Sequence, residues 1–103
     1  GPVILIDKFN VNPEQIDQFL DACKQDASQF KQEPGLVSVQ LHRGIGKSGV
    51  FINYVVWESL RHYKDAFNKV VGENMQSLSK YPDSMIVSPH LFKKVAVPGI
   101  CGD

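Results

Sequence analysis

An asparagine inside an apolar segment is the first residue of this sequence that could do chemistry. The segment FINYVVWES begins at Phe51, and most of its first seven residues are β-branched or aromatic, as in a buried strand. Asn53 interrupts that pattern. A primary amide buried without hydrogen-bond partners costs about 1 to 3 kcal/mol. Asn53 therefore either bonds a neighbour, such as Gln40 on the preceding strand, or donates to a ligand.

Composition and charge indicate one small domain that can bury a core of its own. The 103 residues include 11 basic and 11 acidic side chains, and these are spread along the whole length. Such a balance provides no basic patch for nucleic acid or for an anionic membrane surface. No segment reaches transmembrane length and no signal-peptide pattern is present. Together with the balanced charge, this predicts neither a nucleic-acid nor a membrane partner.

The two cysteines argue against a metal site. Cys23 falls in a helical pattern and Cys101 lies near the end, with no CxxC spacing and no histidine beside either. Free thiols suit a reducing compartment, so we expect no metal and a cytoplasmic location. Gly1 and Pro2 are expected to be the remnant of a cleaved tag. Residues 3–98 are expected to form a single domain, followed by a C-terminal tail at 99–103.

Hydrophobic patterns predict an α+β domain. Strands are expected at 3–9, 36–43, 51–57 and 91–97, with VSPH as a loop before the last. A helix capped by Asn12 should begin at Pro13 and end near Lys31. A second should be capped by Ser59 and end at Gly72, followed by a short helical piece around Met75 and Leu78; its apolar face carries Leu60, Tyr63, Phe67, Val70 and Val71. The order β-α-β-β-α-β is that of a ferredoxin-like domain with an antiparallel sheet.

The register of the central hairpin decides which side chains share a face. If Arg43 pairs with Val50, one face carries the apolar pairs Leu41/Ile52, Val39/Tyr54 and Val37/Val56. The other face then mixes aromatic and polar groups in the pairs His42/Phe51, Gln40/Asn53, Ser38/Val55 and Leu36/Trp57. Two helices cover only one face, so we expect the apolar face to meet a second copy in a homodimer.

The mixed face should then lie under the helices and form a pocket for a small hydrophobic or aromatic ligand. Tyr63 on the second helix points toward it. The expected pocket walls are Leu36, Gln40, Phe51 and Phe67.

The runs PGLVSVQLHRGIGKSGVFINYVVWES and YPDSMIVSPHLFKKVAVPG resemble the antibiotic biosynthesis monooxygenase (ABM) family. Members of that family are small dimeric α-β barrels of ferredoxin-like protomers. The resemblance implies a cofactor-independent monooxygenase that oxidises a small aromatic phenol or quinol, similar to a polyketide, with dioxygen. It also implies roles for four residues: Asn53 would hold the substrate oxyanion, Trp57 would donate its indole N–H, Tyr63 would transfer protons, and His42 would shuttle them.

Two other functions remain open. The same pocket could bind a quinone-like ligand without turnover, so whether the protein is an enzyme is not settled by sequence. A related branch of barrels binds and degrades haem with an asparagine on the first strand and a histidine on the second helix. Here the first strand carries Asp7, and no histidine lies between Tyr63 and Pro89, which disfavours haem.

Overall fold

The protein folds into one four-stranded antiparallel sheet and two helices. The computed structural model describes residues 1–73 and 80–102. Along the chain the elements are β1 (Val3–Asn10), a 3-10 turn (Pro13–Gln15), α1 (Ile16–Phe30), β2 (Leu36–Arg43), β3 (Val50–Trp57), α2 (Leu60–Glu73) and β4 (Ile86–Phe92). The strand order is β2-β3-β1-β4, which confirms the ferredoxin-like arrangement.

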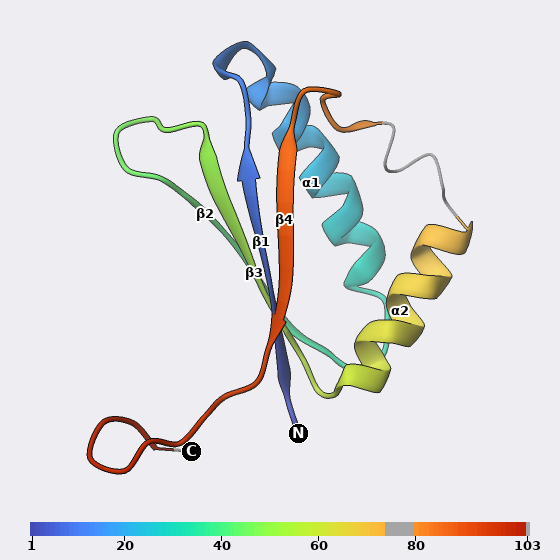
Figure 1. The fold of residues 1–103 in the computed structure, drawn as a ribbon. Helices are drawn as coiled ribbons and strands as arrows, with labels where there is room; N and C mark the ends of the chain where they lie inside the picture. The colour runs from blue at the N-terminus through green and yellow to red at the C-terminus, as the bar shows by residue number, and fades with distance from the viewer. Residues whose placement is uncertain (74–79, 103) are drawn as a thin grey trace.

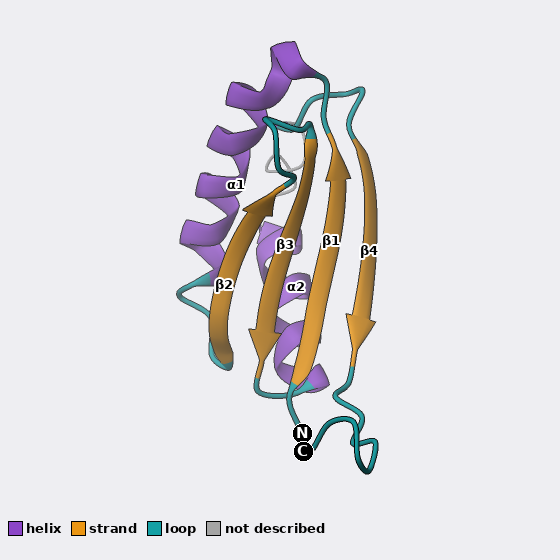
Figure 2. Cartoon of the chain, turned by 90° about the vertical axis from the view of Figure 1, so that its left-hand side faces the viewer, coloured by secondary structure: helices purple, strands orange, loops and turns teal. Residues whose placement is uncertain are grey.

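Both helices lie on the same side of the sheet (Figure 1). Turned by 90°, the molecule presents the four strands in front and both helices behind them (Figure 2). One face of the sheet is therefore covered by helices, and the other carries none within residues 1–73 and 80–102.

The helix starts differ from each other in how they are capped. Asn12 has the extended backbone of an N-cap, but its side chain makes no cap hydrogen bond and instead donates to Ser84 Oγ at 3.1 Å. Pro13 opens a 3-10 turn, so α1 begins at Ile16 rather than at the proline. Ser59 caps α2 as expected, because its Oγ accepts the backbone N–H of His62 at 3.1 Å.

Two boundary predictions near the C-terminus were wrong. The last strand begins at Ile86 and includes Pro89, which we had placed in a loop before a strand at 91–97. β4 is an edge strand, where half of the N–H groups point away from the sheet, so a proline is tolerated there. Gly72 lies within α2 and does not end it. The short helical piece expected around Met75 and Leu78 lies outside the described residues.

The core consists of two apolar clusters on the helix-covered face. One contains Val3, Val55 and Trp57 of the sheet and Ala66 of α2. The other surrounds Phe19 of α1 and includes Phe9, Val11 and Phe51. The two most deeply buried large side chains, Trp57 and Phe19, each sit in a different cluster. α1 contacts both clusters, because Phe30 near its end lies 6.3 Å from the ring of Trp57, and α2 contacts the Trp57 cluster.

Gly35, between α1 and β2, should be a sensitive position for stability. Its φ is +89°, and an added Cβ would lie 2.3 Å from Cγ of His62. The Gly35→Ala variant should therefore lose about 1 to 3 kcal/mol of unfolding free energy in urea titrations, since both backbone and neighbour oppose it.

Two other glycines make matched controls. Gly46 also has a positive φ, of +79°, but an added Cβ would contact nothing within 4 Å, so Gly46→Ala isolates the backbone cost. Gly72 is helical and equally open, so Gly72→Ala should stabilise the protein by about 0.5 to 1 kcal/mol. If Gly35→Ala and Gly46→Ala lose the same unfolding free energy, the contact of the added Cβ with His62 contributes nothing.

Candidate functional site

A polar pair lies in the middle of the helix-covered face. Asp7 of β1 is directly opposite Asn53 of β3 in the antiparallel register, so the two side chains share this face. On one side of the pair, the next row is Leu5 opposite Val55; on the other side it is Phe9 opposite Phe51. Asp7 and Asn53 therefore form a single polar row between the two apolar clusters.

The predicted register of β2 was wrong by one residue over most of its length. Leu36 does pair with Trp57, as expected, but Val37 is an extra residue and Ser38 pairs with Val56. This bulge shifts every later pair, because one inserted residue exchanges the two faces of a strand. Leu41 rather than Gln40 is the partner of Asn53.

His42 and Gln40 consequently lie on the helix-free face, away from Asn53. They pair with Ile52 and Tyr54, and His42 Nε2 lies 3.1 Å from Gln40 Oε1. The structure thus removes Gln40 as the local partner of Asn53 and as a wall of the pocket. It also separates His42 from Asn53 and from the substrate expected beside Asn53, whose protons His42 was expected to shuttle.

Trp57 and Tyr63 do meet on the helix-covered face. Their rings are 6.2 Å apart in an edge-to-face arrangement, and Tyr63 is in turn 5.9 Å from Phe67. Trp57 is only 1% exposed, and its indole Nε1 is buried without a hydrogen-bond partner among the described residues. An unpaired buried donor costs free energy, so a ligand that accepts from it would gain affinity.

Of the remaining predicted walls, Leu36 packs against the Trp57 cluster, whereas Phe51 is 2% exposed in the core of the other cluster.

The surface around the polar row remains accessible. Asn53, Asp7 and Tyr63 are each partly exposed. On the same face, Leu41 is 40%, Leu91 42% and Phe67 44% exposed, which is high for large apolar side chains. The helices thus leave an apolar surface partly open around a polar centre, which is the composition of a small-ligand site.

Burial changes the acid–base properties of this site. Desolvation raises the pKa of Asp7 above the usual carboxyl value, and the Asn53 amide, acting as a donor to the carboxylate, offsets part of that rise. Burial also raises the pKa of Tyr63, and the nearby charge of Asp7 adds to the effect. At neutral pH, Tyr63 is therefore a phenol that can donate a hydrogen bond. Sequence reasoning had assigned Asp7 no role, although a carboxylate in the apolar strand VILIDKF is the same kind of signal as Asn53.

A second titratable cluster lies beside the Phe19 core. The Tyr81 hydroxyl donates to Asp26 Oδ2 at 2.6 Å and so ties the segment before β4 to α1. Burial is the main cause that raises the pKa of Asp26 and of Tyr81, and it raises the pKa of Cys23 to about 11. A thiol with so high a pKa is protonated at neutral pH and unreactive, so this cluster is a structural link.

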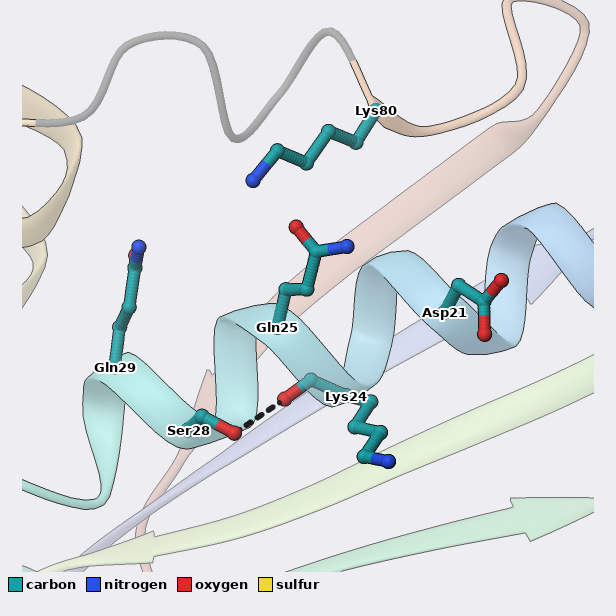
Figure 3. A pocket seen from close by; sticks show the side chains of 6 residues that line it. All are labelled: Asp21, Lys24, Gln25, Ser28, Gln29 and Lys80. Atoms are coloured by element: carbon teal, nitrogen blue, oxygen red, sulfur yellow. Dashed lines mark hydrogen bonds between the residues drawn. The ribbon is translucent and has the colours of Figure 1, made fainter.

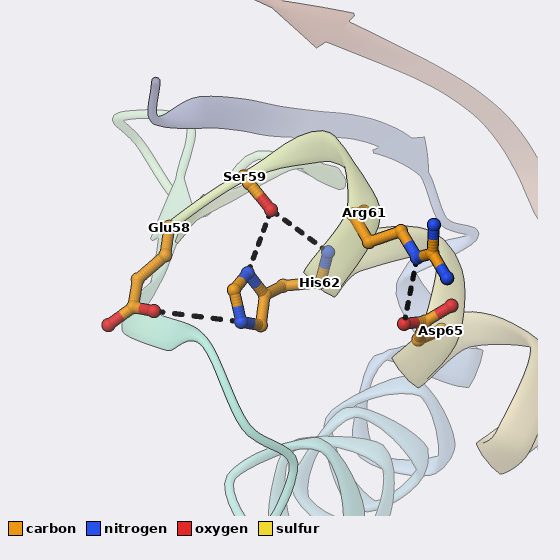
Figure 4. Close-up of polar contacts among 5 residues, drawn as sticks. All are labelled: Glu58, Ser59, Arg61, His62 and Asp65. Atoms are coloured by element: carbon orange, nitrogen blue, oxygen red, sulfur yellow. Dashed lines mark hydrogen bonds and ion pairs between the residues drawn. The ribbon is translucent and has the colours of Figure 1, made fainter.

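The start of α2 carries a serine–histidine–glutamate group that is accounted for by helix capping (Figure 4). Ser59 Oγ lies 2.7 Å from His62 Nδ1, and His62 Nε2 is 3.7 Å from Glu58 Oε2. The same Oγ accepts the backbone N–H of His62, which is the N-cap interaction. These contacts fix the first turn of α2, from which Tyr63 points toward Trp57.

Two surface depressions lie away from this row. One of about 530 Å³ lies along α1 and is lined by Asp21, Lys24, Gln25, Ser28, Gln29 and Lys80 (Figure 3). Another of about 420 Å³ lies between Gln29 of α1 and Lys69 of α2. Neither is lined by Asn53, Trp57 or Tyr63. Both have mostly polar walls that present no convergent reactive group.

Two features are absent from residues 1–73 and 80–102. No helix there is long and apolar enough to cross a membrane. Residues 1–73 and 80–102 also contain no group of three or more His, Cys, Asp or Glu side chains placed to hold a metal ion.

The element order and strand order place the chain among ferredoxin-like α+β proteins. Within that class, the family model described as antibiotic biosynthesis monooxygenase matches residues 2–76. The chain belongs to this family. None of the curated proteins matches it in sequence.

Solved structures share the fold over nearly the whole chain. SnoaB from Streptomyces nogalater, a cofactor-independent oxygenase, superposes with a TM-score of 0.78 at 18% identity, covering 95% of this chain and 97% of its own. A protein from Shewanella loihica PV-4, provisionally named a monooxygenase, gives a TM-score of 0.76 at 24% identity, with 94% and 97% covered. A conserved protein from Methanosarcina mazei Go1 superposes with a TM-score of 0.76 at 16% identity. The match covers 91% of this chain and 93% of that protein. At these identities the likeness establishes the fold.

The Tyr81–Asp26 hydrogen bond should stabilise the protein in a pH-dependent way. In Tyr81→Phe, the partly buried Asp26 carboxylate loses its donor, and its already raised pKa should rise further. The variant should lose about 1 to 2 kcal/mol at pH 7. The loss should shrink as the pH falls through the pKa of Asp26, because the protonated acid has less need of the donor.

Urea titrations at pH 7 and pH 4.5 measure this difference. In an Asp26→Asn background, Tyr81→Phe should lose its pH dependence. A loss of equal size at both pH values in the wild-type background would contradict the assignment.

Proposed function

We propose that the protein is a cofactor-independent monooxygenase that oxidises a small aromatic phenol, quinol or anthrone with dioxygen. The observation that carries the proposal is the position of Asn53. Its amide lies in the centre of the helix-covered face, its expected local partner Gln40 is on the opposite face, and the apolar surface around it is partly exposed. Family membership supplies the reaction class.

Two groups on this face can stabilise a negative charge on a bound substrate. Asn53 has two amide N–H donors, so it can donate to Asp7 and keep one N–H for a substrate, and the buried indole of Trp57 offers an N–H without a partner among the described residues. In the proposed complex both donate to the oxygen of the substrate anion. Donors that are already in place stabilise a developing oxyanion by a few kcal/mol each, because they need no reorganisation.

The proposed reaction removes a proton from the substrate, and the resulting electron-rich anion reduces dioxygen. With an anthrone, one oxygen atom enters the product as a carbonyl that replaces the two hydrogens of the reacting CH2 group, and the other leaves as water. Substrate electrons thus supply the reduction, so the reaction has no need of flavin, haem or metal. The neighbour SnoaB, described as a cofactor-independent oxygenase, supports this choice.

Oxygen consumption by metal-free protein tests the proposal. Offered a panel of anthrones and hydroquinones, the wild-type protein should consume oxygen above the spontaneous rate. Asn53→Ala should lower kcat by about 100-fold, the usual loss for one oxyanion donor.

Asn68→Ala, which changes an exposed asparagine of α2, is the matched control and should retain full activity. If wild-type protein and blank agree across the panel, oxygenase function is wrong. The second candidate, a module that binds quinone-like ligands without turnover, would then be preferred.

We also propose that two copies associate through the helix-free face. The centre of that face is apolar, with Ile4, Ile6, Ile52, Tyr54 and Val56 side by side on β1 and β3. Ile52 is 38% exposed and Phe92, at the edge, is 46% exposed. Polar side chains of β2, including Gln40 and His42, border this patch. An apolar centre with a polar border is the composition of a protein interface.

A negative charge within this patch, at Ile52 between Lys8 and His42, should dissociate the dimer. Ile52→Glu should sediment as a monomer at micromolar concentration, where the wild-type protein sediments as a dimer. Leu41→Glu is the matched control, because Leu41 is 40% exposed but lies on the helix-covered face. Dimers of both variants, or monomers of the wild type, would refute the proposed interface.

A further inference from the structure

The proposed reaction needs a group that accepts the substrate proton. His42 was expected to move protons, but it lies on the helix-free face with Ile52. Tyr63 faces the site, yet burial raises the pKa of its hydroxyl, so at neutral pH it carries a proton and cannot accept one. Neither residue can act as the base in this protomer.

We propose that Asp7 is the general base, and that the site therefore selects neutral aromatic substrates with an acidic O–H or C–H group. This inference rests on the proposed function and names a further catalytic residue for it. Asp7 is directly opposite Asn53, and side chains of such antiparallel pairs have Cβ atoms about 4.5 to 5.5 Å apart. A phenol bound over the row can thus meet the carboxylate and the amide together.

The proton transfer is balanced within this pair. The substrate O–H or C–H bond breaks, its proton forms an O–H bond on the Asp7 carboxylate, and the electron pair stays on the substrate as an anion. Asn53 then donates to the oxygen that carries the new charge. The anion passes its electrons to dioxygen, the co-substrate, and Asp7 gives its proton to the reduced oxygen atom, which leaves as water while the other oxygen atom stays in the product.

The surroundings of Asp7 suit a base better than a structural ion pair. Within residues 1–73 and 80–102, no lysine, arginine or histidine forms an ion pair with it. The facing strand β4 presents apolar residues on this side, including Pro89 as the direct neighbour. α2 contributes Tyr63, α1 contributes the neutral thiol of Cys23 and, beyond it, Asp26, which is bonded to Tyr81.

Burial supports the same role. Desolvation raises the pKa of Asp7, which makes the carboxylate a stronger base than an exposed aspartate. A raised carboxyl pKa also means that the charged form is unfavourable in the folded protein, so it adds nothing to stability at neutral pH. A residue that works against stability in an apolar row is expected where function requires it.

The selectivity for neutral substrates follows from the negative charge of the Asp7 carboxylate. An ionised Asp7 repels an aromatic carboxylate of similar size but accepts a hydrogen bond from a neutral phenol. A quinone without an acidic hydrogen gives the carboxylate nothing to bind. Neutral phenols, quinols and anthrones are therefore the substrate class that the row accepts.

The pH dependence of oxygen consumption by Asp7→Asn tests the assignment. Wild-type kcat/KM should fall as the pH drops through the raised pKa of Asp7, because the base becomes protonated. Asp7→Asn should lose at least about 100-fold in kcat and should also lose this acid limb. The unfolding free energy of Asp7→Asn should equal or exceed that of the wild type, which separates lost chemistry from lost folding.

Asp26 is a second partly buried carboxyl and gives the matched control: Asp26→Asn should keep the fall of kcat/KM at low pH. An Asp7→Asn variant with the wild-type rate and pH profile would overturn the proposal.

A binding experiment separates this proposal from the proposed function. Trp57 is the only tryptophan of the sequence, so its fluorescence reports a ligand on this face. Under nitrogen, wild-type protein should bind a hydroxyanthracene more tightly than its carboxylate analogue, and Asp7→Asn should reduce that preference at least 10-fold. Retained preference in Asp7→Asn, or no binding by either protein, would overturn the role of Asp7. Selective binding without oxygen consumption would refute only the oxygenase function.

Discussion

The β1–β3 register, which sets Asp7 opposite Asn53, is the constraint on which the arrangement of the helix-covered face depends. Two polar residues face each other in the middle of a sheet face that otherwise carries Val3, Leu5, Phe9, Phe51, Val55 and Trp57. This row lies between two apolar clusters; α1 contacts both of them, through Phe19 in one and Phe30 in the other, and α2 packs on the Trp57 cluster through Ala66. The row itself stays partly exposed, while Phe51 and Trp57 on its two sides are buried.

The bulge at Val37 assigns separate tasks to the two faces. It moves Val39 and Leu41 under the helices, where Val39 packs against the Trp57 cluster. It also moves Gln40 and His42 to the helix-free face, where they border an apolar patch. The helix-covered face thus carries the proposed chemistry, and the helix-free face carries the proposed dimer interface. A single extra residue has this effect because side chains alternate along a strand.

The site illustrates how a weakly polar environment gives ordinary residues distinct roles. Asn53 and Trp57 supply donors, Tyr63 keeps its proton, and Asp7 is left as the only partly buried carboxylate in the central row. Desolvation acts on both titratable groups in the direction of the neutral form, but it has opposite consequences for them. It makes the carboxylate a better base and the phenol a weaker acid. The same low polarity strengthens each hydrogen bond to a substrate anion.

The sequence by itself determined the element order, the family and the unusual position of Asn53. Alternation and β-branched residues locate β1, β2 and β3 and place Trp57 on one face of β3, and helical spacing places Tyr63 on the apolar face of α2 that meets it. These signals are local, since they depend on the period of each segment. The register of β2 and the inclusion of Pro89 in an edge strand were decided only in the tertiary structure. A bulge leaves no periodic signal, and a proline has its usual effect only where its missing N–H would have been bonded to a neighbouring strand. The neighbours of Asn53, Asp7 on β1 and Leu41 on β2, follow from long-range pairings, so only the folded sheet shows them, and the role proposed for Asp7 rests on that pairing.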